Sequence, residues 1–409
     1  MPAAPRAATA YSPGAHLSVL DGFRGLAVLL VVVRHASHYF KPNSDAGEIL
    51  RDALGAGWIG VDLFFVLSGF LITGILVDSK GGPHYFRNFY IRRSLRIFPL
   101  YYGFLALIFF VLPQFYQNEG GQFEALQDRQ VWYWTYLVNV LGAAGGLTPL
   151  NTTHLWSLAV EEQFYLVWPA VVLWCSRRRL AEVSIAMLAT ALVLRVIVTT
   201  FYENALPQGA YMLTPMRMDA LALGGLLALA LRHPGGMERV RGLAPYVLAG
   251  ATASMLILHV DTGGLDWMRD GVTQTVGFTI VAAFAVALLA TVIVGPERNP
   301  LRRAIDARWL RALGKYSYAI YLFHYPLLNT VRYLWPMEEV PYLLGAKFVA
   351  QAVFTLALLL ASFALAWLSW HVYEKHFLAL KRFFPTGSPA GARKAETVAP
   401  AEAATDGAR

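Results

Sequence analysis

Charge and cysteine are both scarce in this sequence of 409 residues. Charged residues make up 15% and apolar residues 56%, whereas a soluble globular chain carries about 25% charged residues. Cys175 is the only cysteine, so no internal disulfide can form. The sequence also lacks a Walker loop, a G-x-S-x-G turn and a cysteine–histidine metal cluster. We therefore expect a membrane protein without a metal site.

Apolar runs near the ~20 residues needed to cross a bilayer recur along the whole sequence. They predict an all-α, polytopic integral membrane protein with about ten transmembrane helices. Residues 131–142 are aromatic but too short to cross, which favours an interfacial or re-entrant piece. No removable signal peptide is evident, so the first apolar segment is expected to be an uncleaved anchor. The expected spans are 17–39, 58–78, 97–113, 156–175, 182–200, 214–231, 244–260, 273–294, 316–331 and 343–371.

Lysine and arginine fall unevenly between these spans. If the N-terminus is cytoplasmic, the inner segments hold 24 of them and the outer segments hold 5. This split follows the positive-inside rule and predicts that both termini are cytoplasmic. It also explains the net charge of +8 without a nucleic-acid partner. The expected units are a cytoplasmic N-terminal tail (1–16), a transmembrane domain (17–375) and a disordered cytoplasmic C-terminal tail (376–409).

The first span, "LDGFRGLAVLLVVVRHASHYF", contains an arginine and a histidine whose spacing places them on one helix face. Arg24 and His35 are eleven residues apart, which is ~16 Å along a helix axis and close to three full turns. Both side chains therefore share one face. Charge is costly in hydrocarbon, so that face should look into protein or water. Snorkelling of the two residues toward opposite interfaces is the alternative.

Carboxylates in two later spans are expected at the same outer end as His35. Asp62 begins one span, and Glu161 and Glu162 lie a turn or two into another. Adjacent helical residues point about 100° apart, so only one of the two glutamates can face His35. A histidine beside a carboxylate is an acid–base pair. A buried polar network that only holds helices together is the alternative.

A basic cluster, "FYIRRSLRIFP", is expected at the inner end. It contains Arg92, Arg93 and Arg96, and the last two share a helix face. Positive-inside anchoring explains such a cluster, but the planar fork of arginine also suits phosphate. With Arg24 nearby, the cluster indicates a phosphorylated ligand at the cytoplasmic mouth.

Residues 315–327, "KYSYAIYLFHYPL", place His324 in the middle of a span. Ser317 and Tyr321 lie on related turns. These side chains either line a passage or are satisfied by neighbouring helices, and the sequence alone leaves both possibilities open.

Five stretches, in this order, make the sequence similar to the acyltransferase family 3 membrane O-acyltransferases. The resemblance implies a domain of about ten helices that transfers an acyl group, usually acetyl from acetyl-CoA, to a hydroxyl of a glycan or another acceptor. The stretches are "LDGFRGLAVLLVVVRH", "GWIGVDLFFVLSGFLI", "FYIRRSLRIFPLYY", "HLWSLAVEEQFYLVWP" and "YSYAIYLFHYPL".

The resemblance also implies roles for particular residues. Its R-x10-H pattern falls on Arg24 and His35, and its R-x-x-R pattern on Arg93 and Arg96. Its S-L-x-x-E stretch includes Glu161. His35 is then expected to act as a base or transient acyl carrier, oriented by Glu161, and the arginines to hold the acyl-CoA phosphates. Some members carry a fused SGNH hydrolase-like domain, which leaves open a separate periplasmic partner for this chain.

The resulting expectation is a bacterial inner-membrane O-acetyltransferase that binds acetyl-CoA and a glycan or lipid-linked saccharide. A succinyl donor and a small-molecule acceptor such as a macrolide remain alternatives. Other classes remain open too: a proton-coupled transporter, because histidine and glutamate within spans suit proton relays, and a non-catalytic subunit of an export complex. The sequence shows no internal repeat of the kind from which many transporters are built.

Overall fold

Helices form all the regular structure in the part of the chain that this computed structural model describes, which is residues 17–37, 45–115, 122–146, 152–262, 270–334 and 347–385. This agrees with the expected all-α class. The longer helices are α1 (Ser18–Ser37), α2 (Asp45–Gly55), α3 (Ile59–Ser79), α4 (Tyr85–Ala106), α8 (Trp156–Trp174), α9 (Arg177–Phe201), α11 (Thr214–Ala230), α12 (Gly236–Asp261), α13 (Phe278–Val294), α16 (Ser317–Leu334) and α17 (Lys347–Ser369). The shorter helices are α5 (Gln122–Asp128), α6 (Gln130–Trp134), α7 (Val138–Ala143), α10 (Gly209–Met212), α14 (Pro300–Ile305), α15 (Arg308–Lys315) and α18 (Lys375–Ala379).

Within the described residues, seven helical stretches are long and apolar enough to cross a membrane. They coincide with seven of the expected spans, and the other three expected spans fall on α1, α8 and α16. These three helices carry Arg24, Glu161 and His324, among other polar residues that lower their average hydropathy. The total of about ten spans therefore remains a prediction.

The peripheral helices expose large apolar side chains. Ile185 on α9, Ile257 on α12 and Leu360 on α17 are all more than half exposed. Many exposed large apolar side chains are unfavourable in water and suit contact with lipid. The segment 131–142, by contrast, falls on two short helices, α6 and α7, and neither is long enough to cross a bilayer.

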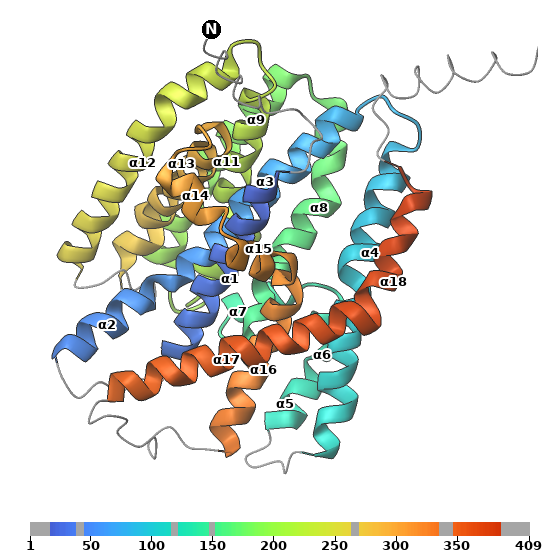
Figure 1. Cartoon of the computed structure of the whole chain (residues 1–409), viewed down its shortest axis with the longest axis vertical. Helices are drawn as coiled ribbons and strands as arrows, with labels where there is room; N and C mark the ends of the chain where they lie inside the picture. Colours follow the sequence, from blue (N-terminus) through green and yellow to red (C-terminus); the bar gives the residue numbers. More distant parts are fainter. Residues whose placement is uncertain are drawn as a thin grey trace, which may run out of the picture.

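The centre of the molecule is built where helices cross closely (Figure 1). Helix α3 packs against α1, α8, α11 and α13. A Cβ atom on Gly69 of α3 would lie 1.9 Å from the carbonyl oxygen of Leu221 on α11, so only glycine permits that crossing. A Cβ atom on Gly314 of α15 would lie 1.7 Å from the carbonyl oxygen of Asp21 on α1. This second crossing brings the end of α15 against the turn of α1 that holds Arg24.

The C-terminal end of the described chain folds back along α4. After α17, a π-helical segment η7 (Trp370–Glu374), α18 and a 3-10 turn η8 (Leu380–Phe383) continue the helix. The guanidinium of Arg92 donates hydrogen bonds of 3.0 Å to the carbonyl oxygens of Lys381 and Phe384. Residues 376–385 therefore differ from the disordered tail expected there, because polar contacts to α4 order them. Residues 1–16 and 386–409, together with the neighbours of His35 from His38 to Ser44, lie outside the described residues.

Candidate active site

Two histidines that are far apart in the sequence meet through their rings. Nδ1 of His35, near the end of α1, lies 2.9 Å from Nε2 of His324 in the middle of α16. Nδ1 of His324 lies 2.7 Å from the carbonyl oxygen of Tyr321. A carbonyl oxygen only accepts, so this Nδ1 carries a proton, and Nε2 of the neutral His324 ring is then an acceptor. The proton between the two rings therefore belongs to His35 Nδ1, and the lone pair of His35 is on Nε2.

A third histidine, His154, lies against this pair. It comes from the 3-10 turn η4 (Thr153–Leu155) that precedes α8, and its side chain is 2% exposed. Its ring centroid is 5.3 Å from that of His324 and 5.3 Å from that of Tyr325. At least one of its ring nitrogens has no hydrogen-bond partner among the described residues. Sequence analysis did not single out His154, although it opens the "HLWSL" stretch.

His35 and His154 line a cavity of about 220 Å³, here called the histidine cavity. Its walls are mostly aromatic, and the described residues that line it include no carboxylate. The remaining lining residues are Val31, Arg34, Trp58, Val61, Thr153, Trp156, Gln208, Tyr211, Met212, Tyr321 and Tyr325.

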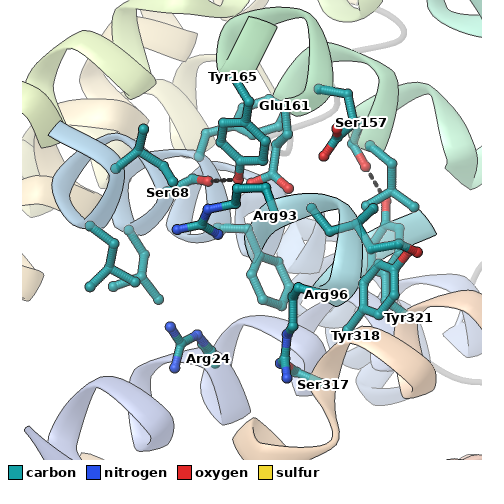
Figure 2. Close-up of a pocket in the computed structure, with 18 of the residues that line it drawn as sticks. Arg24, Ser68, Arg93, Arg96, Ser157, Glu161, Tyr165, Ser317, Tyr318 and Tyr321 are labelled. Atoms are coloured by element: carbon teal, nitrogen blue, oxygen red, sulfur yellow. Dashed lines mark hydrogen bonds between the residues drawn. The ribbon is translucent and has the colours of Figure 1, made fainter. Parts of the chain in front are cut away.

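A second cavity of about 140 Å³ lies beside it and is here called the glutamate cavity, because Glu161 and Glu162 line it. Figure 2 shows the carboxylate of Glu161 close to Tyr165 and Arg93. The hydroxyl groups of Tyr165 and Ser68 form a short hydrogen bond, and the guanidinium carbon of Arg93 lies 5.3 Å from the Tyr165 ring centroid. The other polar residues of this cavity are Arg24, Arg96, Ser157, Ser317, Tyr318 and Tyr321.

A third and larger cavity, of about 680 Å³, is here called the basic cavity. Seven cationic side chains line it against two carboxylates, Asp21 and Asp78. Arg24 Nη1 lies 2.7 Å from the carboxylate of Asp21, and Arg232 makes a two-pronged ion pair of 2.6 and 2.7 Å with Asp78. The excess positive charge suits a ligand that carries several negative charges. The cationic residues are Arg24, Arg92, Arg93, Arg96, Arg232, Lys315 and Lys381.

The three cavities follow one another through the molecule. Arg24, Arg93 and Arg96 line both the basic and the glutamate cavity, and Tyr321 lines both the glutamate and the histidine cavity. Arg24 and His35 therefore stand at opposite ends of one series of cavities. This arrangement explains how an apolar helix accommodates an arginine and a histidine on one face: both side chains look into cavities.

Two residues lie elsewhere than expected. Asp62 lines none of the three cavities; it is 1% exposed and forms a 2.7 Å ion pair with the buried Arg217 of α11. Glu161 lines the glutamate cavity rather than the histidine cavity, and Nδ1 of His35 donates its hydrogen bond to Nε2 of His324. The sequence predicted that a carboxylate would orient His35, whereas in the structure His324 takes that position.

The other expected residues divide between the cavities. Ser317, Tyr321 and Glu162 line the glutamate cavity, and Arg92 lines the basic cavity. Sequence analysis missed Arg232, Lys315 and Lys381, which it counted only as positive-inside charges.

Comparison with known proteins gives a consistent result. The sequence profile described as "Acyltransferase domain" matches residues 17–371. The chain is 29% identical over 387 residues to YrhL of Bacillus subtilis, an alignment that covers 89% of this chain and 54% of that protein. It is 30% identical over 325 residues to "Peptidoglycan O-acetyltransferase OatA" of Listeria monocytogenes, which covers 76% of this chain and 49% of that protein. It is 25% identical over 348 residues to "O-acetyltransferase OatA" of Staphylococcus aureus, with coverages of 81% and 53%.

The chain thus spans about half the length of the curated relatives that it matches. No solved structure matches it at a significant level.

Proposed function

The chain belongs to acyltransferase family 3, and on this premise we propose that it is a membrane O-acyltransferase that transfers an acetyl group from acetyl-CoA to a hydroxyl of a glycan beyond the membrane. The observation that carries the proposal is the series of cavities from Arg24 to His35, because it joins a site for a polyanion to a site for acid–base chemistry.

The basic cavity is the proposed site of the donor's phosphates. Arg93 and Arg96 project from α4 toward the cavity wall shared with Arg24 (Figure 2). Arginine forks match phosphate oxygens in pairs. Arg92 also lines this cavity, but part of its guanidinium is bound to the carbonyl oxygens of Lys381 and Phe384. We therefore assign the donor phosphates mainly to Arg24, Arg93 and Arg96, with Arg92 holding the C-terminal segment in place.

The pantetheine arm of the donor would extend from the basic cavity through the glutamate cavity toward His35. Arg24 and His35 are separated by eleven residues of one helix, or ~16 Å, so an extended arm rather than the compact head group must cover the distance. The positive-inside charge split places the basic cavity on the cytoplasmic side in this proposal. The thioester would then reach the histidine cavity from the inside and the acceptor from the outside.

His35 is the proposed general base. Its Nε2 lone pair takes the proton of the acceptor hydroxyl while the hydroxyl oxygen attacks the thioester carbonyl carbon. The carbon–sulfur bond then breaks, and the proton moves from Nε2 to the departing sulfur. The products are an acetyl ester and free CoA thiol, so atoms and charge balance. A transient acyl group on Nε2 is the alternative, and it would use the same nitrogen as nucleophile.

A glycan acceptor is proposed because the relatives from Listeria and Staphylococcus are named as O-acetyltransferases, the former of peptidoglycan. The bacterial cytoplasmic membrane is the location that this activity requires. A separate partner outside the membrane that completes transfer to the final acceptor is also part of the proposal.

The proposal is tested with purified protein in lipid nanodiscs. Acetyl-CoA affinity is measured by calorimetry, and acetyl esters on glycan fragments are counted by mass spectrometry. We expect His35→Ala to lose transfer while it still binds acetyl-CoA. The double variant Arg93→Ala/Arg96→Ala should lose donor affinity, by about 1.5–3 kcal/mol for each charged hydrogen bond removed.

The matched control is Arg178→Ala, because that arginine is 91% exposed and its ion pair among the described residues is with Glu182 of its own helix. It should change neither quantity. Normal transfer by a well-folded His35→Ala protein would contradict the assignment of the base, and unchanged donor affinity in the double arginine variant would contradict the donor site.

A further inference from the structure

The histidine cavity contains buried polar groups that the chemistry above does not use. His154 is 2% exposed and lines the cavity, and at least one of its ring nitrogens has no hydrogen-bond partner among the described residues. The hydroxyl of Thr153, which also lines the cavity, is buried and without a partner. A buried polar group without a partner is costly, and native structures usually satisfy it with protein, water or ligand. These two side chains therefore indicate something polar that occupies the cavity.

Other residues that line the histidine cavity are aromatic and closely packed. The ring centroids of Trp156 and Tyr211 are 4.5 Å apart, and those of Trp58 and Tyr211 are 6.4 Å apart. Tyr325 closes another side, with its ring centroid 4.9 Å from that of His35. The cavity thus combines flat apolar surfaces with a few polar atoms, which is the usual composition of a small-molecule site.

The aromatic wall has a rigid support behind it. The guanidinium carbon of Arg217 lies 4.3 Å from the ring centroid of Phe278 and 5.2 Å from that of Tyr211. Arg217 is itself fully buried and held by its ion pair with Asp62. A buried guanidinium is costly unless its ion pair and ring contacts are maintained, so we expect this cluster to restrict the orientation of Tyr211. This gives Asp62 a part in the site that is indirect rather than catalytic.

We propose that the histidine cavity is the acceptor subsite and that it binds a single sugar ring. The inference rests on the proposed function and specifies the acceptor. The C–H face of the sugar packs on the rings of Trp156 and Tyr211, whose electron-rich faces attract the slightly positive C–H groups. The sugar hydroxyls supply the missing partners of His154 and Thr153. The ring so held presents one hydroxyl to Nε2 of His35.

The size of the cavity favours a sugar ring over a bulky acceptor. Its volume of about 220 Å³ is below the ~300–1,000 Å³ of sites that enclose drug-sized ligands. A macrolide ring would therefore require the walls to move. One ring of a longer glycan fits without such movement, with the rest of the chain outside the cavity.

The test separates acceptor binding from donor binding in the same protein. His154→Phe keeps the ring and removes both nitrogens, and Trp156→Ala removes the stacking surface. We expect each to lower acetylation of peptidoglycan glycan fragments about tenfold or more, because an unmatched polar or stacking contact weakens acceptor recognition. Acetyl-CoA affinity in calorimetry should stay within about twofold of the wild type.

Two milder variants guard against simple misfolding. His154→Gln restores a hydrogen-bonding side chain, and Trp156→Phe restores an aromatic face, so each should recover part of the lost acetylation. Ser362→Ala on α17 is the control, because that hydroxyl is also buried and without a partner but lines none of the three cavities. It should behave as the wild type.

Three results would overturn the proposal. Unchanged acetylation in His154→Phe and Trp156→Ala would mean that the cavity holds only ordered water. Equal loss of donor affinity would assign these residues to the donor. Equal loss in the milder variants and in Ser362→Ala would mean that the effect is structural. Failure of the wild type itself to consume acetyl-CoA would instead contradict the proposed function, so the two failures are distinguishable.

Discussion

Three histidines from three separate parts of the chain meet in the structure, and each is held differently. His324 is fixed by carbonyl oxygens of its own helix, and His35 is fixed by His324. His154 is packed against His324, and at least one of its ring nitrogens has no hydrogen-bond partner among the described residues. This difference supports separate roles in the proposed reaction, in which His324 orients His35, His35 moves the proton and His154 contacts the acceptor.

A first prediction concerns His324 as the positioning residue. Its Nε2 accepts the Nδ1–H of His35, so its loss frees the His35 ring to rotate or change tautomer. Replacement by leucine, which fits the fully buried site, should lower kcat for transfer about 10²- to 10⁴-fold, the range that general-base catalysis contributes. The KM for acetyl-CoA should hardly change, because His324 does not line the basic cavity.

The matched variant is His324→Gln, whose side-chain oxygen can also accept a hydrogen bond from His35. It should retain activity within about tenfold of the wild type, since the acceptor and hence the tautomer are kept. Thermal unfolding should show both variants folded. Equal activity in His324→Leu and His324→Gln would show that the histidine pair does not set the reactive nitrogen.

The sequence predicted these residues to different degrees. The spacing of Arg24 and His35 on one helix was enough to predict two ends of a passage, because spacing along a helix converts directly into distance. The pairing of His35 with His324 was not predictable, because it depends on how α1 and α16 pack. His154 carried no local signal beyond its place before "WSL", since burial without a partner is a property of the fold.

The basic cavity is lined mainly by α1, α3 and α4, and the end of α15 and the segment after α17 add to it. The close crossing at Gly314 brings Lys315 toward the Arg24 turn, and the segment 375–385 adds Lys381. Arg92 and Asn88 of α4 hold that segment through its carbonyl oxygens, with the amide of Asn88 2.9 Å from the carbonyl oxygen of Pro385. The C-terminal segment is therefore part of the donor site in this account.

A second prediction follows for this segment. A chain that stops after Glu374 loses Lys381 and the carbonyl oxygens that hold Arg92, so its acetyl-CoA affinity should fall about tenfold or more, the value of a charged hydrogen bond. A chain that stops after Pro385 keeps these groups and should bind the donor normally. Calorimetry on the two purified proteins measures the difference.

The point variant Lys381→Ala tests the charge of the lysine alone, because the backbone of the segment stays intact. It keeps the backbone carbonyl that Arg92 binds, so it should cause a smaller loss than the chain that stops after Glu374. If both truncated chains bind acetyl-CoA like the full chain, the segment has no part in donor binding.

At the level of elements, apolar periodicity located the helices that meet lipid, and it located the polar helices α1, α8 and α16 as well. Periodicity could not show that α1, α8 and α16 carry candidate site residues such as His35, Glu161 and His324, because mean hydropathy does not record where single polar residues lie. Sequence analysis grouped residues 376–385 with the Pro/Ala/Gly-rich residues that follow, although this segment is itself rich in apolar and aromatic side chains. Hydrogen bonds to α4 hold it in place.

For the whole molecule, the separation of charge gives the proposed direction of transfer. Seven lysine and arginine side chains line the basic cavity, whereas Arg34 is the one such side chain among the described residues that line the largely aromatic histidine cavity. In the proposed topology, the excess of lysine and arginine in one set of loops puts the basic cavity on the cytoplasmic side. Acetyl-CoA is charged and cytoplasmic, so it can reach the basic cavity without crossing lipid.

A third prediction tests this orientation by thiol labelling on a Cys175→Ser background. Asp52→Cys in α2 and Arg303→Cys in α14 stand in segments that the charge split places on opposite sides. An impermeant thiol reagent added to intact cells should label the first and spare the second. Both should be labelled after permeabilisation. The reverse pattern in intact cells would invert the topology.

The most direct test of the central claim uses protein reconstituted in sealed vesicles of defined orientation. Glycan fragments are placed on the side of the histidine cavity, and acetyl-CoA with a labelled acetyl group is placed on the side of the basic cavity. We predict that the label appears on the glycan across the sealed membrane, and that His35→Ala abolishes its appearance. Label on the glycan only when donor and acceptor share one side would contradict the account.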